Sequence, residues 1–106
     1  MRILFDQGTP VPLRRSLHPH TVDTASEMGW ATLTNGELIA AAEEAGFDAM
    51  ITTDQNLKYQ QNLTRKNLGI IVLKTTSWPR IRTSISQIIS GVNSSPSSGY
   101  LEIEFD

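Results

Sequence analysis

The run Ile70-Ile71-Val72-Leu73 carries no polar side chain, and it constrains the fold more than any other feature of the chain. A strand of this composition is buried on both faces, which is typical of a parallel sheet that helices cover on both sides. Residues 3–5 and 49–52 are similar short apolar runs, and the β-branched alternation of residues 20–24 predicts a more exposed strand. The sequence therefore predicts four strands of one sheet.

Segments with helical signals separate these strands. Two prolines precede a short helical stretch at residues 13–17, and proline is tolerated in the first turn of a helix. Asn35 is a suitable N-cap for a helix that Gly46 closes, and residues 78–89 carry apolar side chains at helical spacing. Strands and helices in alternation predict an α/β fold, a three-layer sandwich with a mainly parallel central sheet of four strands wrapped by helices.

The C-terminal part of the chain has a different composition. Residues 93–99, NSSPSSG, predict a flexible linker after an α/β domain of residues 1–92. Residues 100–106 alternate apolar and acidic side chains, which predicts a half-buried strand at a sheet edge. Such a strand can pair within its own subunit or be exchanged with a neighbouring one, so a homodimer is one expectation.

Composition limits the functional classes. The chain has 106 residues, which fits one domain, and it has no cysteine, which excludes disulfides, thiolate zinc sites and thiol nucleophiles. No apolar run approaches the ~18 residues of a membrane span, so we expect a soluble cytoplasmic protein with no membrane partner.

Charge is distributed unevenly. The formal net charge of -2 argues against indiscriminate binding to nucleic acid, yet residues 58–82 hold six cations and no acid. This run indicates either a solvated face or a basic surface for RNA, on which Lys58 and Arg65 are the candidate contacts to substrate phosphate.

Two aspartates follow strands of the predicted sheet. Asp6 ends the first strand and Asp54 follows the third, and the carboxyl ends of parallel strands are where such sheets bind ligands. Neighbouring strands lie ~4.8 Å apart, so the two carboxylates can share a cation if these strands are close, and Glu37 in a nearby helix start could supply a third. Oxygen ligands without His or Cys favour Mg²⁺ or Mn²⁺. Such an ion would orient a water and lower its pKa.

Each acid also has a purely structural interpretation. Asp54 is a suitable helix N-cap, Asp6 could simply end its strand, and Glu37 could compensate the dipole of its helix. What favours a site is that all three acids are predicted at the same edge of the sheet.

The stretches RILFDQGTP and ITTDQNL, with Glu37 between them, resemble the short bacterial PIN-like domains. These form a compact branch of the PIN nuclease superfamily related to the Mut7-C type, and the resemblance covers roughly residues 1–90. It implies a Mg²⁺-dependent endoribonuclease that cleaves single-stranded RNA, of the kind used as the toxin of a toxin–antitoxin pair with a cognate antitoxin protein. It further implies that Asp6, Glu37 and Asp54 are the catalytic metal ligands.

The sequence departs from the family pattern at three positions. Gln7 stands where Glu is common, and Asn35 and Asn56 stand where Asp is common. Each replacement keeps an oxygen but removes a charge, so we expect a secondary polar shell with a lower metal affinity. A second hypothesis is therefore a catalytically impaired module that binds nucleic acid or protein. A third, a phospho-receiver-like switch with Lys74-Thr75-Thr76, is disfavoured because paired acids are missing after the first strand.

Overall fold

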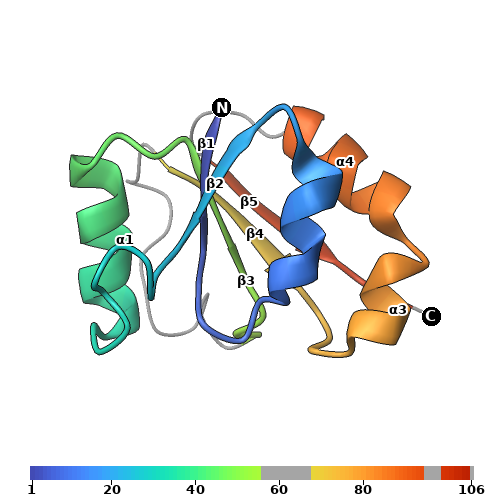
Figure 1. Ribbon diagram of the computed structural model, residues 1–106, viewed down its shortest axis with the longest axis horizontal. Coiled ribbons are helices and arrows are strands. Elements are labelled where there is room, and N and C mark those ends of the chain that lie inside the picture. Colours follow the sequence, from blue (N-terminus) through green and yellow to red (C-terminus); the bar gives the residue numbers. More distant parts are fainter. Residues whose placement is uncertain (56–67, 95–98, 106) are drawn as a thin grey trace.

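The computed structural model describes residues 1–55, 68–94 and 99–105, which contain a five-stranded sheet (Figure 1). All of its strand pairs are parallel, and the strand order is β2-β1-β3-β4-β5. The strands are β1 (Arg2–Phe5), β2 (Thr21–Thr24), β3 (Ala49–Thr52), β4 (Gly69–Leu73) and β5 (Gly99–Ile103). The α/β class and the four predicted strands are confirmed, and the C-terminal strand is a full parallel member of the sheet.

Helices cover both faces of this sheet, which gives the predicted three layers. The helical elements are η1 (Val11–Leu17), α1 (Asn35–Glu44), α3 (Trp78–Arg82) and α4 (Ile85–Ser94). Figure 1 shows α1 on one face and η1, α3 and α4 on the other. The segment expected at residues 13–17 begins two residues earlier and is a 3-10 helix.

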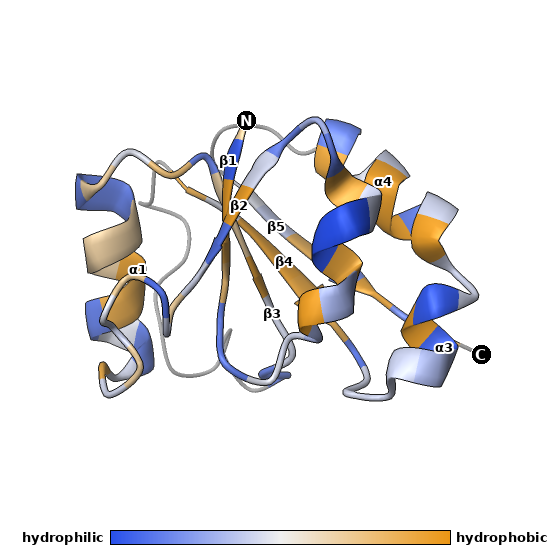
Figure 2. Cartoon of the chain, in the orientation of Figure 1, coloured by the Kyte–Doolittle hydropathy of each residue, from blue (hydrophilic) through white to orange (hydrophobic). Residues whose placement is uncertain are grey.

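Side chains of each strand alternate between two hydrophobic clusters. In β1, Ile3 and Phe5 pack with η1, α3 and α4, whereas Leu4 packs with α1 on the opposite face. Every residue of β3 and β4 is buried, which explains why residues 70–73 are uniformly apolar. Figure 2 shows these hydrophobic strands between helices in which hydrophobic and hydrophilic residues are mixed.

The single helix expected over residues 78–89 is instead two helices, α3 and α4. The backbone N–H and the hydroxyl of Thr83 both donate to the Arg80 carbonyl, at 3.3 and 2.8 Å, and this local bonding ends α3. Trp78, Ile81 and Ile88 nevertheless pack in the same cluster. The apolar spacing therefore predicts the buried faces correctly, but it does not predict the break between α3 and α4.

The C-terminal strand pairs with β4 of its own chain. Its register places Gly69 opposite Gly99 and Leu73 opposite Ile103, and Lys74 forms an ion pair with Glu104 at 3.0 Å. The linker boundaries need correction, because residues 93 and 94 belong to α4 and residue 99 belongs to β5. In the described part of the chain, no helix combines the length and apolarity that crossing a membrane requires.

Candidate metal site

The position of β1 creates the candidate site. β2 lies on one side of β1 and β3 on the other, so the chain changes direction across the sheet between β1 and β3. In open parallel sheets such a change leaves a crevice at the carboxyl ends of the strands. Asp6 leaves β1 at this edge, and its backbone N–H donates to the Ile51 carbonyl of β3 at 3.0 Å. Asp54 follows β3 two residues beyond its end, as predicted.

The hydroxyl of Thr52 joins the two aspartates. Thr52 is fully buried at the end of β3, where its Oγ1 donates to Asp6 Oδ2 at 2.8 Å. The same oxygen accepts from the backbone N–H of Asp54 at 3.1 Å. The hydroxyl thus donates one hydrogen bond and accepts another, which satisfies a polar group that would otherwise be costly to bury.

The carboxylate of Asp6 is partly buried and resists ionisation. Burial raises the pKa of Asp6 above its ordinary value of 3.8, and the nearby charge of Asp54 raises that pKa further. Hydrogen bonds from Thr52 and from the backbone N–H of Gln7, the latter at 2.7 Å, offset part of this effect. A divalent cation would relieve the part of this rise in pKa that comes from the charge of Asp54.

Asn35 approaches this pair from the first turn of α1. Its Nδ2 donates to Asp54 Oδ2 at 2.6 Å, which links α1 to the segment after β3. The sequence predicted Asn35 as the N-cap, but the N-cap is Thr34. Asn35 is therefore the first residue of the helix, and its amide is directed to the site instead of to the helix backbone.

Glu37 does not join the two aspartates. Its backbone N–H donates to Thr34 Oγ1 at 3.3 Å, and its carboxylate accepts from the Thr34 backbone N–H at 2.9 Å. These hydrogen bonds form a capping box and lower the pKa of Glu37. Within the described residues, no three His, Cys, Asp or Glu side chains are grouped closely enough to hold a metal. The predicted three-acid cluster is thus reduced to two carboxylates.

The loop after Asp6 is tightly fitted against β3. Gly8 has a φ of +91°, and a Cβ at this position would lie 2.9 Å from Thr53 Oγ1, so only glycine fits without strain. Buried Thr9 donates through Oγ1 to the Ile51 carbonyl at 3.0 Å. This loop therefore holds the backbone around Asp6 in one position.

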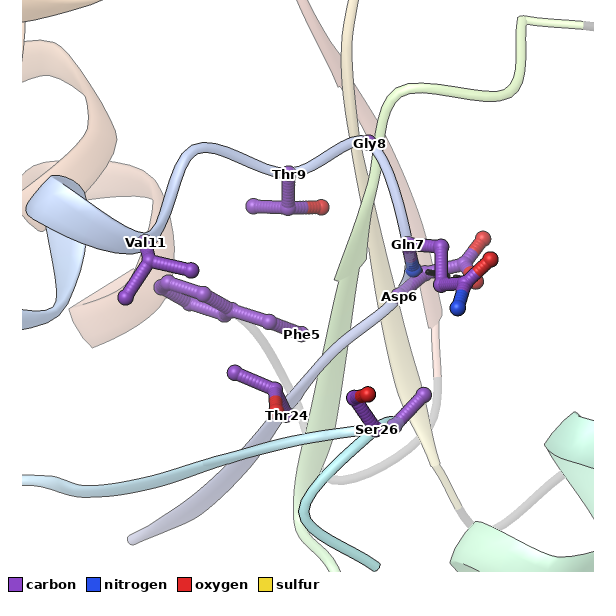
Figure 3. A pocket seen from close by; sticks show the side chains of 9 residues that line it. Phe5, Asp6, Gln7, Gly8, Thr9, Val11, Thr24 and Ser26 are labelled. Atoms are coloured by element: carbon purple, nitrogen blue, oxygen red, sulfur yellow. Dashed lines mark hydrogen bonds between the residues drawn. The ribbon is translucent and has the colours of Figure 1, made fainter. Parts of the chain in front are cut away.

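A pocket of about 330 Å³ opens beside Asp6, between the ends of β1 and β2 (Figure 3). Buried Phe5 forms its apolar wall, and exposed Gln7 lies at the same end as Asp6. The remaining lining residues are Gly8, Thr9, Val11, Thr24, Ala25 and Ser26. A ligand bound at the aspartates would have space for a neighbouring group here.

Thr52 is the residue that sequence reasoning missed. A threonine that ends a fully buried strand, two residues before an acid, must find partners for its hydroxyl, and this was the available signal. Of the predicted polar shell, Gln7 lines the pocket beside Asp6 and Asn35 donates to Asp54, whereas Asn56, like the candidate phosphate contacts Lys58 and Arg65, lies outside the described residues.

Comparisons of the chain with protein families, curated proteins and solved structures found no match. The similarity to PIN-like domains therefore stays a prediction that depends on the matched residues.

Proposed function

We propose that the protein is a metal-dependent PIN-like nuclease that uses Asp6 and Asp54 to hold Mg²⁺ or Mn²⁺ and cleaves single-stranded RNA. The observation that carries this proposal is the meeting of the two aspartates at the switch point, joined through Thr52. Two carboxylates that repel each other in the free protein match the needs of a hard divalent cation.

The residues fit such an ion by their donor chemistry. Asp6 and Asp54 each offer a carboxylate, and the Asn35 amide can present its oxygen after releasing Asp54. Water molecules would complete the coordination, as is usual for Mg²⁺. When bound, the ion would supply a water of lowered pKa and stabilise charge on the phosphate.

Each protein group then has a defined task. Asp6 and Asp54 would hold the ion through their carboxylates, while Thr52 links the carboxylate of Asp6 to the backbone N–H of Asp54. In the hydrolysis the water oxygen forms a bond to phosphorus, the bond from phosphorus to the leaving ribose oxygen breaks, and the water proton ends on that oxygen. The toxin role and a cognate antitoxin are supported by the resemblance of residues 1–90 alone.

A cleavage assay on a labelled single-stranded RNA tests this proposal. Wild-type protein should cleave with Mn²⁺ and not with EDTA. Asp54→Asn should lower the cleavage rate by more than the roughly 10–100-fold that is typical when a residue hydrogen-bonded to a metal ligand is removed, because it removes a direct ligand. Glu37→Gln is the matched control, since it removes one carboxylate from the capping box and should keep the wild-type rate. Equal rates for Asp54→Asn and wild type would refute the metal role.

The second candidate, a binding module without turnover, is favoured by one observation. The Asn35 amide donates to Asp54, and Glu37 is held in a capping box, so only two carboxylates meet. This module would bind RNA or a protein partner. It would not cleave RNA, with or without saturating Mn²⁺. The assay above separates the two candidates, because only a nuclease responds to the ion.

A further inference from the structure

A second hollow lies beside the pocket at Asp6. It encloses about 680 Å³ between η1 and the start of α3. Val11 lines both hollows, and its side chain is 53% exposed, which makes it one of the most exposed large apolar residues described. The two hollows therefore adjoin at the first residue of η1. We call the second one the η1–α3 groove; its lining residues are Val11, Pro12, Arg14, Arg15, Ser16 and Trp78.

This groove combines a cation with an aromatic ring. Arg15 is exposed, whereas Arg14 is paired with Glu27 through its two terminal guanidinium nitrogens, which fixes its position and neutralises its charge. Trp78 packs against the core cluster on one side and keeps part of its surface in the groove. The net charge of the groove lining together with Glu27 is therefore positive.

We propose that the η1–α3 groove binds the single-stranded RNA on one side of the phosphate held at the aspartates. In this arrangement Trp78 stacks on a base, Arg15 contacts a backbone phosphate, and Val11 covers the passage between the two hollows. The inference rests on the proposed function for its choice of RNA. It adds a binding surface formed by residues outside the metal site.

Charge and continuity favour this occupant. A cation beside an aromatic side chain is the combination that binds single strands, because every base has a stackable face and every linkage has a charge. The groove and the pocket that Asp6 lines share the lining residue Val11, so one strand could contact both. Among the described residues that line the groove, the uncharged polar groups are the Ser16 hydroxyl and the Trp78 indole N–H, and we therefore expect weak preference for base sequence.

The first test measures binding by fluorescence anisotropy of a labelled oligouridine in EDTA, over a series of salt concentrations. Arg15→Ala should weaken binding roughly fivefold at low salt and reduce the salt slope by about 0.7, the value for one phosphate contact on a single strand. Arg82→Ala is the matched control, because Arg82 is an exposed cation of α3 that does not line the groove. Equal losses in the two variants would overturn the proposal.

The second test uses the two tryptophans of the chain. Trp30 packs edge-on against Phe47 in the cluster on the other face of the sheet, 6.1 Å between ring centroids. In Trp30→Phe, oligouridine should quench the fluorescence of Trp78, whereas in Trp78→Phe it should leave Trp30 unchanged. Both replacements keep an aromatic ring in the core, and circular dichroism checks that each variant folds. Quenching of Trp30, or of neither residue, would overturn the groove assignment.

The outcomes separate this inference from the proposed nuclease function. Binding that depends on Arg15 and Trp78, without cleavage in Mn²⁺, would support the groove and refute the nuclease. Cleavage in Mn²⁺ with unaltered binding by Arg15→Ala and no quenching of Trp78 in Trp30→Phe would do the reverse. An acidic peptide, poly-glutamate, that quenches Trp78 as strongly as oligouridine does would overturn RNA as the occupant and indicate a protein partner.

Discussion

The carboxyl edge of β1 and β3 and the first turn of α1 each hold an acid at the end of an element, but the two environments have opposite effects. Burial and the charge of Asp54 raise the pKa of Asp6, while hydrogen bonds from Thr34 lower the pKa of exposed Glu37. Glu37 stabilises the helix in its charged form. The charged form of Asp6 is disfavoured by burial and by the charge of Asp54, and a bound cation would stabilise that charged form. The same chemical group thus supports the fold in one region and is prepared for a ligand in the other.

The largest expected effect concerns metal affinity. Asp6→Asn and Asp54→Asn should each abolish Mn²⁺ binding measured by titration calorimetry, because one carboxylate is too few for a hard divalent ion. Glu37→Gln should bind Mn²⁺ as the wild type does. If Glu37→Gln also lost binding, the distinction between the two regions would be wrong, and Glu37 would have to reach the ion in the bound state.

The next effect concerns the hydroxyl that joins the aspartates. Thr52→Val keeps the shape of the buried side chain but removes the acceptor of the Asp54 N–H and a donor to Asp6. We expect a loss of about 1–3 kcal/mol in the free energy of unfolding, the typical cost of leaving such a partner unsatisfied. Urea denaturation measures it. Thr21→Val is the control, because Thr21 is exposed in β2 and should change stability little.

A smaller effect is expected at the start of α1. Thr34→Ala removes the N-cap hydroxyl and should cost about 1 kcal/mol in urea denaturation, without changing Mn²⁺ affinity. Thr34→Ser keeps the hydroxyl and should restore stability. A fall in metal affinity in Thr34→Ala would show that the cap also positions Asn35 at the site. The first turn of α1 and the carboxyl edge of β1 and β3 would then not be independent.

The smallest effect is in the pH dependence. Glu37 has a lowered pKa in the folded protein, so its contribution to stability is present above its unfolded value of 4.5 and is lost as the pH falls through the folded pKa. Asp6 has a raised pKa, so stability is lost as the pH rises from 3.8 through its folded pKa. Carboxyl-carbon NMR titration should find the pKa of Asp6 above 3.8 in the wild type, and lower in Asp54→Asn than in the wild type. An unchanged Asp6 value in that variant would exclude repulsion between the two acids.

Much of the fold was predictable because the relevant signals are local. Burial on both faces makes β3 and β4 uniformly apolar, and the strand–helix alternation leaves few topologies. The break between α3 and α4 was not predicted, because the apolar spacing continues across it and the side-chain bond of Thr83 that ends α3 is not a spacing signal.

The site was predictable only in part, for a similar reason. Asp6 and Asp54 follow strands, so topology alone brings them together once β1 and β3 are neighbours. The placement of Glu37 depends instead on which residue caps α1, and Thr34 and Asn35 are both good candidates. Only Thr34 lies three positions before a Glu, the capping-box spacing, and this signal decides the competition. The place of Thr52 at the end of a buried strand indicates that its hydroxyl needs a partner, but not that this partner is Asp6, 46 residues away in sequence.

The central position of β1 has a consequence for amide hydrogen exchange. The N–H of Asp6 donates to the Ile51 carbonyl, so it can meet solvent deuterium only when β1 separates from β3. That separation also opens both hydrophobic clusters, since β1 contributes to each. The Asp6 amide should therefore belong to the most slowly exchanging class, with a protection factor that reports the global free energy of unfolding. A partly opened molecule would not retain the paired aspartates, so the candidate site and the cooperative core are lost in one event.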